Sequence, residues 1–321
     1  MLKDLVKSRK KEGYAIPILE QQTLVEGHRD RMKRSRGVFH PSEICGDWFC
    51  PREWLLCERD RSLYSKRKVN VNTQMRFDVG KWLHRMVQEK LGNAGVLFGR
   101  WKCLRRCLDE KCIQFGFKPG RECPEADKRG THALWVFDEL PVQDDELLID
   151  GSTDGLLVTK GCKYVFEFKT MYDDGFATLM EPLAEHKEQG LWYLDVLERR
   201  NRELETFFME AANQGLDVSR QLEVVRMPFS GVVILYMNKN DQTMREFLVR
   251  GKRPPTWEFL VKADDPVRDV IEEKREVLKQ TLVHKENQTL PPRLARCSDK
   301  TVYRAKMCLA RKECFECKGD E

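Results

Sequence analysis

The segment KYVFEFKT, residues 163–170, places two charged residues inside an otherwise apolar stretch that predicts a buried strand. Side chains of a strand alternate between its two faces, so the three aromatic residues are predicted to share one face while Glu167 and Lys169 share the other. One interpretation is a half-exposed strand with a surface ion pair, which is common and contributes little stability. The other is a buried site that requires both charges, and the surrounding sequence favours it.

A second acidic residue is predicted to lie beside Glu167. The stretch ELLIDGSTDGLLV (146–158) predicts a strand that the tight turn TKGC joins to residues 163–170, which brings Asp154 close to Glu167. Adjacent carboxylates repel each other and are stable as anions mainly when a divalent cation neutralises them, and oxygen ligands suit Mg²⁺ or Mn²⁺. Such a cation polarises a phosphodiester and lowers the pKa of a bound water, while Lys169 positions that water or offsets phosphate charge.

The stretches GSTDG and FEFKT together resemble the signature of the PD-(D/E)XK nuclease superfamily, and the motifs around them resemble its RecB branch. That branch includes the nuclease domains of bacterial helicase-nucleases and the CRISPR-associated exonucleases. The resemblance covers most of residues 40–317 and implies an α/β, restriction-endonuclease-like fold, with a mixed central sheet flanked by helices. It also implies hydrolysis of phosphodiester bonds in DNA, by exonuclease action on single strands or processed ends.

The same resemblance implies the identity of the site residues. A histidine on an upstream helix is a further metal ligand in this branch, and His84 in GKWLHRMVQEKL stands at the matching place. The branch also has a Gln-x3-Tyr motif, which Gln189 and Tyr193 in EQGLWYL match; one helical turn apart, both can face the substrate, and Tyr193 can stack on a base. The implied catalytic residues are Asp154, Glu167, Lys169, Gln189 and Tyr193, and the implied Mg²⁺ or Mn²⁺ ligands are His84, Asp154 and Glu167.

Twelve cysteines in a chain expected in a reducing compartment indicate metal binding rather than disulfides. Nucleases of the RecB branch often join their chain ends through a [4Fe-4S] cluster, held by one cysteine before the nuclease core and three after it. The resemblance implies Cys50 as the early ligand and Cys308 and Cys314 as two late ones. Cys297 is favoured over Cys317 as the fourth ligand, and zinc is the alternative at this site because four thiolates suit both metals.

A second group of cysteines lies within residues 101–125, a Lys/Arg-rich stretch with Gly and Pro that is predicted to be an insertion. Four cysteines within 21 residues predict a structural zinc site, although their spacing of x3, x4 and x10 is not a standard zinc-finger pattern. The predicted ligands are Cys103, Cys107, Cys112 and Cys123. The alternative is that they are small core residues, as is expected for the remaining Cys45, Cys57 and Cys162.

Periodicity and turn residues divide the chain into segments. Helices are predicted over 73–92, 183–203 and 265–285, and a strand pair over 230–238 and 244–250. The predicted organisation is a basic N-terminal arm (1–39), a helical segment with the first cluster cysteine and the histidine motif (40–100), the cysteine-rich insertion (101–125), the nuclease core (126–250), and a C-terminal helix with a cluster-binding tail (251–321).

The charge of the chain is unevenly placed. Residues 1–36 contain ten Lys or Arg and five acidic residues, an excess equal to the net charge of +5 of the whole chain. This predicts a basic arm that contacts phosphates, with a merely solvated face as the alternative. No apolar run approaches the length that spans a bilayer and no signal-peptide pattern is present, so we expect a cytoplasmic protein.

The expected partner is DNA, preferentially single-stranded, with a helicase or recombination protein as a further partner and a role in recombination, replication or repair. No helicase motif occurs, so unwinding would come from such a partner. The alternative function is a non-catalytic DNA-binding or assembly subunit that retains the nuclease fold. The sequence predicts neither the polarity of digestion nor the oligomeric state.

Overall fold

A mixed β-sheet forms the centre of the molecule. The computed structural model describes residues 16–33, 35–66, 70–103, 113–120, 135–245, 258–261 and 267–316. Its main sheet has the strand order β10-β8-β7-β6-β1-β2, with β3 paired to β1 and β9 to β8. The strands are β1 (Leu97–Cys103), β2 (Ile113–Phe117), β3 (Trp135–Phe137), β6 (Leu156–Thr159), β7 (Cys162–Met171), β8 (Phe229–Asn238), β9 (Met244–Arg245) and β10 (Glu258–Val261). Among the described strands of this sheet, β7 and β8 pair in parallel and the other pairs are antiparallel, so the predicted mixed sheet is confirmed.

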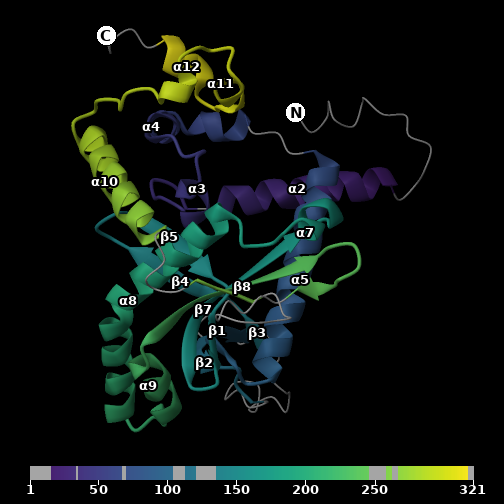
Figure 1. The fold of residues 1–321 in the computed structure, drawn as a ribbon, viewed down its shortest axis with the longest axis vertical. Helices are drawn as coiled ribbons and strands as arrows, with labels where there is room; N and C mark the ends of the chain where they lie inside the picture. The colour runs from purple at the N-terminus through teal and green to yellow at the C-terminus, as the bar shows by residue number, and fades with distance from the viewer. Residues whose placement is uncertain are drawn as a thin grey trace.

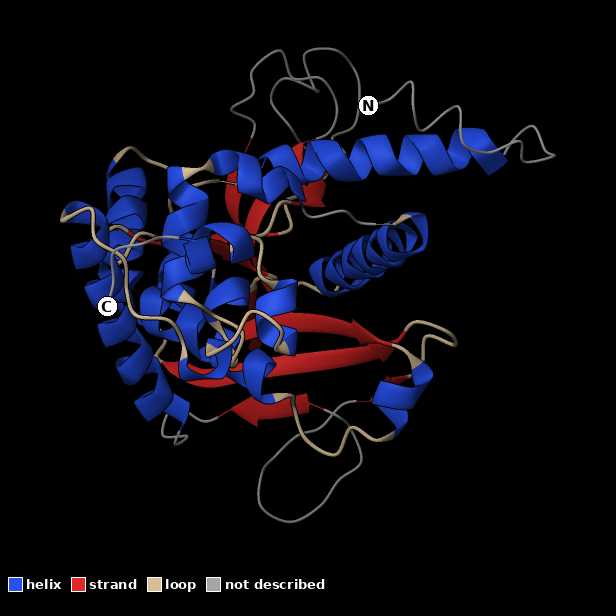
Figure 2. Cartoon of the chain, turned by 90° about the horizontal axis from the view of Figure 1, so that it is seen from above, coloured by secondary structure: helices blue, strands red, loops and turns tan. Residues whose placement is uncertain are grey.

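The charged strand predicted over residues 163–170 is β7, and its two faces differ as the alternation requires. Phe166 and Phe168 pack in one hydrophobic cluster together with Val87 of helix α5 (Val71–Asn93). Val165, on the opposite face, packs in a second cluster with residues of helix α8 (Ala184–Asn213). Helices therefore cover both faces of the sheet, as Figure 2 shows. Between these layers β7 is buried along most of its length.

Residues 146–158 form two strands rather than the single predicted one. Strand β5 (Ile149–Thr153) pairs with β4 (Leu140–Asp144) in a separate two-stranded sheet, whereas β6 pairs with β7. The chain changes sheet at Asp154 and Gly155, and Gly155 has a φ of +124°, which disfavours any residue with a side chain. A Cβ at Gly155 would also lie 2.7 Å from Leu97 Cδ1. Residues 135–144 are likewise divided, between β3 of the main sheet and β4 of the two-stranded sheet.

The helix predicted over 183–203 is correct in position but ends ten residues later. Helix α8 continues to Asn213 because residues 204–213 contain no glycine or proline and keep an inward-facing apolar side, on which Phe208 is buried. Two short helices lie beside it, α7 (Asp173–Ala177) before α8 and α9 (Ser219–Arg226) after it. Together α7, α8 and α9 connect the parallel strands β7 and β8.

The early and late parts of the chain pack together at one end of the molecule. Helix α3 (Pro41–Ile44), helix α4 (Pro51–Arg59) and the 3-10 turn η1 (Arg61–Lys66) belong to the early part. The late part is α10 (Val267–Glu286), the 3-10 turn η2 (Ala295–Cys297), α11 (Tyr303–Met307) and α12 (Arg311–Glu316). Helix α4 contacts both α10 and α12, and Figure 1 shows α4 beside α11 and α12.

The described part of the predicted N-terminal arm is a helix, α2 (Ile16–Lys33), which packs on α5. Thr23 Oγ1 lies 3.5 Å from Met75 Sδ at this contact. Residues 1–15 and 34 lie outside the described residues. The prediction of an arm over residues 1–39 is therefore incomplete, because Ile16–Lys33 forms a helix that packs on α5.

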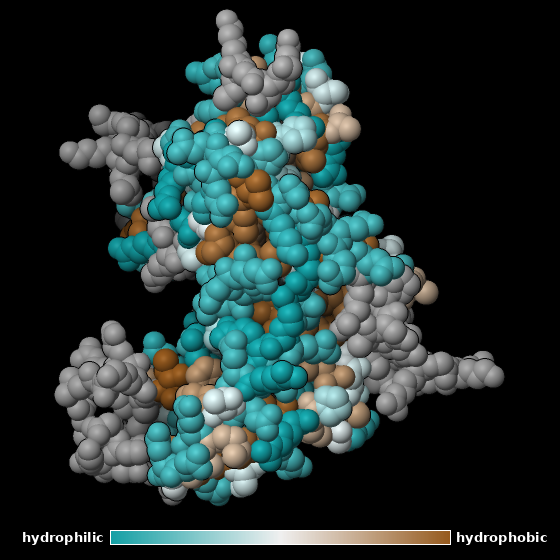
Figure 3. Space-filling model, turned by 90° about the vertical axis from the view of Figure 1, so that its left-hand side faces the viewer, coloured by the Kyte–Doolittle hydropathy of each residue, from teal (hydrophilic) through white to brown (hydrophobic). Residues whose placement is uncertain are grey.

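Part of the predicted insertion belongs to the main sheet. Trp101 of β1 is fully buried, and its indole nitrogen donates to Gly116 O of β2 at 3.1 Å. Residues 104–112 and 121–125 lie outside the described residues. In the described ranges no helix is long and apolar enough to cross a membrane. The face that Figure 3 shows carries mostly hydrophilic side chains, with hydrophobic ones scattered among them.

Candidate functional site

Asp154 lies in the link between β5 and β6 and is held by three hydrogen bonds. Its Oδ1 is 3.1 Å from His84 Nδ1 and accepts from Gln88 Nε2 at 3.1 Å. Its Oδ2 accepts from the backbone N–H of Phe168, on β7, at 2.8 Å. His84 and Gln88 stand one turn apart on α5, so a helix, a link and a strand meet at this carboxylate. His84 and Asp154, which the resemblance implies as ligands of one cation, thus lie in hydrogen-bond contact.

Glu167 and Lys169 form a buried ion pair, because residues two apart on a strand point to the same side. Lys169 Nζ lies 3.0 Å from Glu167 Oε2 and donates to Gln189 Oε1 of α8 at 2.8 Å. Gln189 Nε2 in turn donates to the Tyr193 hydroxyl at 2.9 Å. The surface ion pair, the first interpretation of this strand, is wrong, since only 3% of Glu167 is exposed.

Burial changes the protonation of these groups. It raises the pKa of Glu167 to about 7, against the opposing effect of the Lys169 ammonium, and the charge of Asp154 raises it further. Burial alone would lower the pKa of His84, but the hydrogen bond and the charge of Asp154 outweigh it, so this pKa is raised. The pKa of Lys169 is likewise raised because Glu167 outweighs the effect of burial. The carboxylate beside each of these two groups therefore stabilises its positive form, Asp154 that of His84 and Glu167 that of Lys169.

The donors at this site are of the types that bind a hard divalent cation: two carboxylates and an imidazole. Glu167 Oε1 is buried and has no hydrogen-bond partner in the described part of the chain, which leaves one oxygen available. In the same ranges no group of three or more His, Cys, Asp or Glu side chains is arranged so that it could hold a metal ion. The donor types therefore fit a divalent cation, although the oxygens of Asp154 are engaged in hydrogen bonds in this arrangement.

Two neighbours of the site were missed by sequence reasoning. Gln88 follows His84 by four residues on a predicted helix, and that spacing could have identified it. Glu139 precedes β4, and its carboxylate accepts from the Ser152 hydroxyl. Burial raises the pKa of Glu139, the charge of Asp154 raises it further, and the charge of His84 opposes both. No sequence pattern indicated Glu139, because it comes near Asp154 only through the pairing of β4 with β5.

The predicted base-stacking role of Tyr193 is wrong. Only 3% of Tyr193 is exposed, and its ring packs in the hydrophobic cluster under α8. A Cβ built on Gly151 would lie 3.4 Å from Tyr193 Cε1, so the ring also fills the space beside β5. One helical turn does place Gln189 and Tyr193 side by side, but the turn faces the core. Tyr193 can position Gln189 and, through it, Lys169.

The cysteines predicted at the chain ends lie in the region where α4 meets the tail. Cys50 caps the N-terminus of α4, where its sulfur accepts from Glu53 N at 3.5 Å. Burial raises the pKa of Cys50, and Cys297 is close enough to contribute electrostatically. Burial also raises the pKa of Cys308, with Glu53 and Cys50 among the further causes. Cys314 packs in a hydrophobic cluster with Cys57, which the sequence interpretation left unassigned. The alternative ligand Cys317 lies outside the described residues.

Of the cysteines predicted to bind structural zinc, the structure describes Cys103 alone. Cys103 ends β1 and is buried in the cluster beneath α5. Cys107, Cys112 and Cys123 lie outside the described residues.

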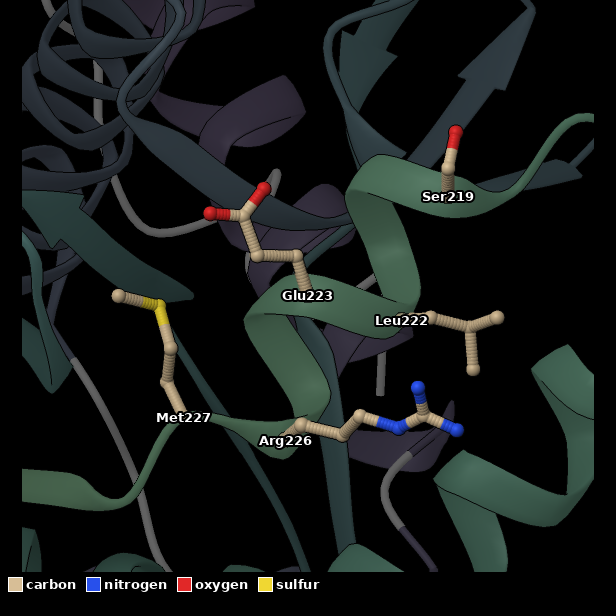
Figure 4. Close-up of a pocket in the computed structure, with 5 residues that line it drawn as sticks. All are labelled: Ser219, Leu222, Glu223, Arg226 and Met227. Atoms are coloured by element: carbon tan, nitrogen blue, oxygen red, sulfur yellow. The ribbon is translucent and has the colours of Figure 1, made fainter.

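A surface pocket of about 560 Å³ lies on α9, apart from the residues of the site. Figure 4 shows its lining residues, which are Ser219, Leu222, Glu223, Arg226 and Met227. None of them contacts the Asp154 or Glu167 side chain in a hydrogen bond or ion pair. This pocket therefore adds nothing to the site.

The sequence matches no protein-family model and no curated protein. One solved structure, titled "Crystal structure of SSO0001", is similar over 94% of this chain and 97% of that chain, with 12% sequence identity and a TM-score of 0.40. A likeness of this degree does not bear on function.

Proposed function

We propose that this chain is a metal-dependent deoxyribonuclease that resembles the RecB branch of the PD-(D/E)XK superfamily. The observation that supports it is the meeting of Asp154, Glu167 and Lys169 with His84 of α5 at the middle of the sheet. These four chemical types, drawn from three separate parts of the chain, are what phosphodiester hydrolysis with a divalent cation requires. The restriction-endonuclease-like classification of the fold and the metal-joined chain ends belong to the same proposal.

Each side chain has a role that follows from its contacts. His84, Asp154 and Glu167 would hold Mg²⁺ or Mn²⁺, which when bound supplies Lewis acidity and an activated water. Lys169, held by Glu167 and Gln189, places a positive charge where it can offset charge on the attacked phosphate. Gln88 and the Phe168 N–H hold the Asp154 carboxylate in one orientation. The substrate is single-stranded DNA or processed DNA ends, which the chain degrades as an exonuclease.

Cleavage of end-labelled DNA by charge-neutral variants tests the proposal. Asp154→Asn and Glu167→Gln keep the shape of each side chain but weaken metal ligation. Loss of an outer-shell residue typically costs about 10- to 100-fold, and cleavage with Mn²⁺ by these two variants should fall by more than that. Asp150→Asn, on β5 in the same segment, is the matched control and should cleave like the unaltered protein. Linear and circular single strands of one sequence distinguish exonuclease from endonuclease action.

Cleavage by Glu167→Gln at the unaltered rate would overturn the active-site assignment. Binding of DNA without cleavage in either Mg²⁺ or Mn²⁺ would instead favour the non-catalytic DNA-binding or assembly subunit. Equal digestion of circles and linear strands would overturn the exonuclease assignment alone.

A further inference from the structure

Two cations lie beside one exposed aromatic ring just beyond the end of β7, and a second exposed ring follows one of these cations in helix α5. They are Arg76, Phe77, Tyr172 and Lys239, here called the aromatic–cation patch. Arg76 Cζ lies 5.1 Å and Lys239 Nζ 5.3 Å from the centroid of the Tyr172 ring. Phe77 is 52% and Tyr172 40% exposed, so large apolar surfaces face solvent beside positive charge. Burial, and then the charge of Arg76, lowers the pKa of Lys239.

No described carboxylate forms an ion pair with Arg76 or Lys239. The acidic residue nearest in sequence to Tyr172 is Asp173, and its two oxygens accept from the side-chain amides of Asn238 and Asn240, the first at 2.6 Å. Asp173 is thus engaged by amides rather than by either cation, and among the described residues the two like charges lie near each other with neither in an ion pair. The repulsion between two such cations decreases when an anion binds beside them.

The patch lies along the face of β7 that packs on α5 and meets His84. Alternate residues of β7, and the residue that follows it, face successive turns of α5, in the pairs Phe168 with His84, Thr170 with Gly80, and Tyr172 with Arg76. Eight helical residues separate His84 from Arg76, which corresponds to roughly 12 Å along the helix axis. The patch therefore lies about two helical turns from His84, on the α5 side of β7, whereas Glu167 and Lys169 point to the α8 side.

The backbone holds the patch in place. Lys239 N donates to Met171 O at 2.7 Å, and Lys239 Nζ donates to Arg76 O at 3.2 Å. These bonds tie the turn after β8 to the end of β7 and to α5. Figure 1 shows α5 and α7 next to each other. The two cations are therefore already in position before any ligand binds.

We propose that the aromatic–cation patch binds single-stranded DNA and guides it into the site, an inference that rests on the proposed nuclease function. Two positive charges match adjacent backbone phosphates, and exposed rings offer stacking surfaces to bases, which are accessible only when a strand is unpaired. The buried Tyr193 cannot supply such a surface, whereas Phe77 and Tyr172 can. The patch thus favours a single strand over an intact duplex.

The test measures binding without cleavage, by fluorescence anisotropy of a labelled 20-mer of dT in EDTA. The double variant Arg76→Gln/Lys239→Gln should bind at least about tenfold more weakly, and the slope of log affinity against log salt should flatten by about 1.4, or 0.7 for each lost phosphate contact. Phe77→Ala should weaken binding about 5- to 20-fold with an unchanged slope, because stacking involves no counterion release. Thermal unfolding should show that each variant is folded.

The matched control is Arg85→Gln/Arg220→Gln, which removes two positive charges that also lie over aromatic rings, Trp82 and Phe117. It should keep nearly full affinity. Equal losses in the two double variants, tighter binding of a duplex or of a 20-mer of rU, or failure of the unaltered protein to bind dT would each overturn the patch assignment. If DNA binding depended on the patch but the protein cleaved no DNA, the nuclease proposal would be overturned and the patch assignment would stand. If the protein cleaved DNA but its binding did not depend on the patch, the patch assignment would be overturned and the nuclease proposal would stand.

Discussion

At the scale of single residues, Asp154 is the most constrained side chain of the site. Its carboxylate receives hydrogen bonds from α5 and from the backbone of β7, and it has only 6% exposure. A buried carboxylate held in this way has one orientation, so the atoms that a cation would contact are fixed before it arrives. We therefore expect Gln88 to influence the affinity for the proposed cation through the orientation of Asp154.

Gln88→Leu should weaken Mn²⁺ binding about 10- to 100-fold, because it removes an outer-shell hydrogen bond to a metal ligand. Gln74→Leu is the matched control: Gln74 is on the same helix, is equally buried at 4% exposure, and donates to Asp78 at 3.1 Å, away from the site. Calorimetric titration with Mn²⁺ measures the affinity, and urea unfolding measures the stability of both variants. If the two variants lost affinity equally, Gln88 would have only a structural role.

The sequence identified which residue types meet at the site but not how all of them are oriented. Strand alternation placed Glu167 and Lys169 on one side of β7, and the ion pair confirms it. Helical spacing placed Gln189 next to Tyr193, but it did not show that this side of α8 faces the core. Orientation about a helix axis depends on packing partners distant in sequence, so a short motif does not determine it.

At the scale of elements, β7 and its turn to β6 were predictable because a buried strand and a tight turn have local signals. The division of residues 146–158 between two sheets was not, because the change of sheet depends on Gly155 and its neighbour Leu97 from a different strand. The contact between α8 and β8 was equally hidden. It includes the ring nitrogen Nδ1 of His186, which lies 2.8 Å from the Tyr236 hydroxyl.

The lowered pKa of His186 predicts that the folded chain loses stability in acid. Burial, and to a lesser degree the charge of Lys169, lowers the pKa of His186 from 6.5 to about 3. Above pH 6.5 the ring is neutral in both folded and unfolded chains, whereas between about pH 6.5 and 3 only the unfolded chain binds the proton, so unfolding becomes easier as the pH falls. This group should contribute a loss of about 1.4 kcal/mol per pH unit in that range.

Urea unfolding of the unaltered protein and of His186→Gln at pH 7.5, 5.5 and 4.5 measures this contribution. The variant can keep a hydrogen bond to Tyr236 but does not titrate, so its stability should fall less steeply with acid, by up to one proton. Equal slopes in the two proteins would show that His186 is not the group responsible.

At the scale of the whole molecule, the two ends of the chain are joined by polar contacts around α4. Glu53 Oε2 lies 2.7 Å from Arg304 Nη2, and Glu53 Oε1 accepts from Leu309 N at 2.8 Å. Arg52 Nη1 donates to Pro291 O at 2.8 Å. These contacts place Cys50 in the electrostatic environment of Cys297 and Cys308, an arrangement that the sequence suggested only through resemblance.

The proposed metal at this junction is tested by composition. Protein purified without oxygen should be brown and contain about four iron and four sulfide per chain if a [4Fe-4S] cluster joins the ends. Cys50→Ser, Cys308→Ser and Cys314→Ser should each lose iron and unfold at a lower temperature, because the cluster would close a loop of most of the chain. Cys162→Ser, at the first residue of β7, is the matched control and should retain its iron.

The fourth ligand follows from the same measurement. Loss of iron in Cys297→Ser, with iron retained in Cys317→Ser and Cys57→Ser, is the expected result, because among the described residues Cys297 acts electrostatically on Cys50. Loss of iron in Cys57→Ser instead would identify Cys57, which packs in the hydrophobic cluster that contains Cys314, as the fourth ligand. A colourless protein with zinc and no iron would establish the four-thiolate zinc site. If the protein contained neither metal and all these variants unfolded alike, the junction would be held by Glu53 and Arg304 without a metal.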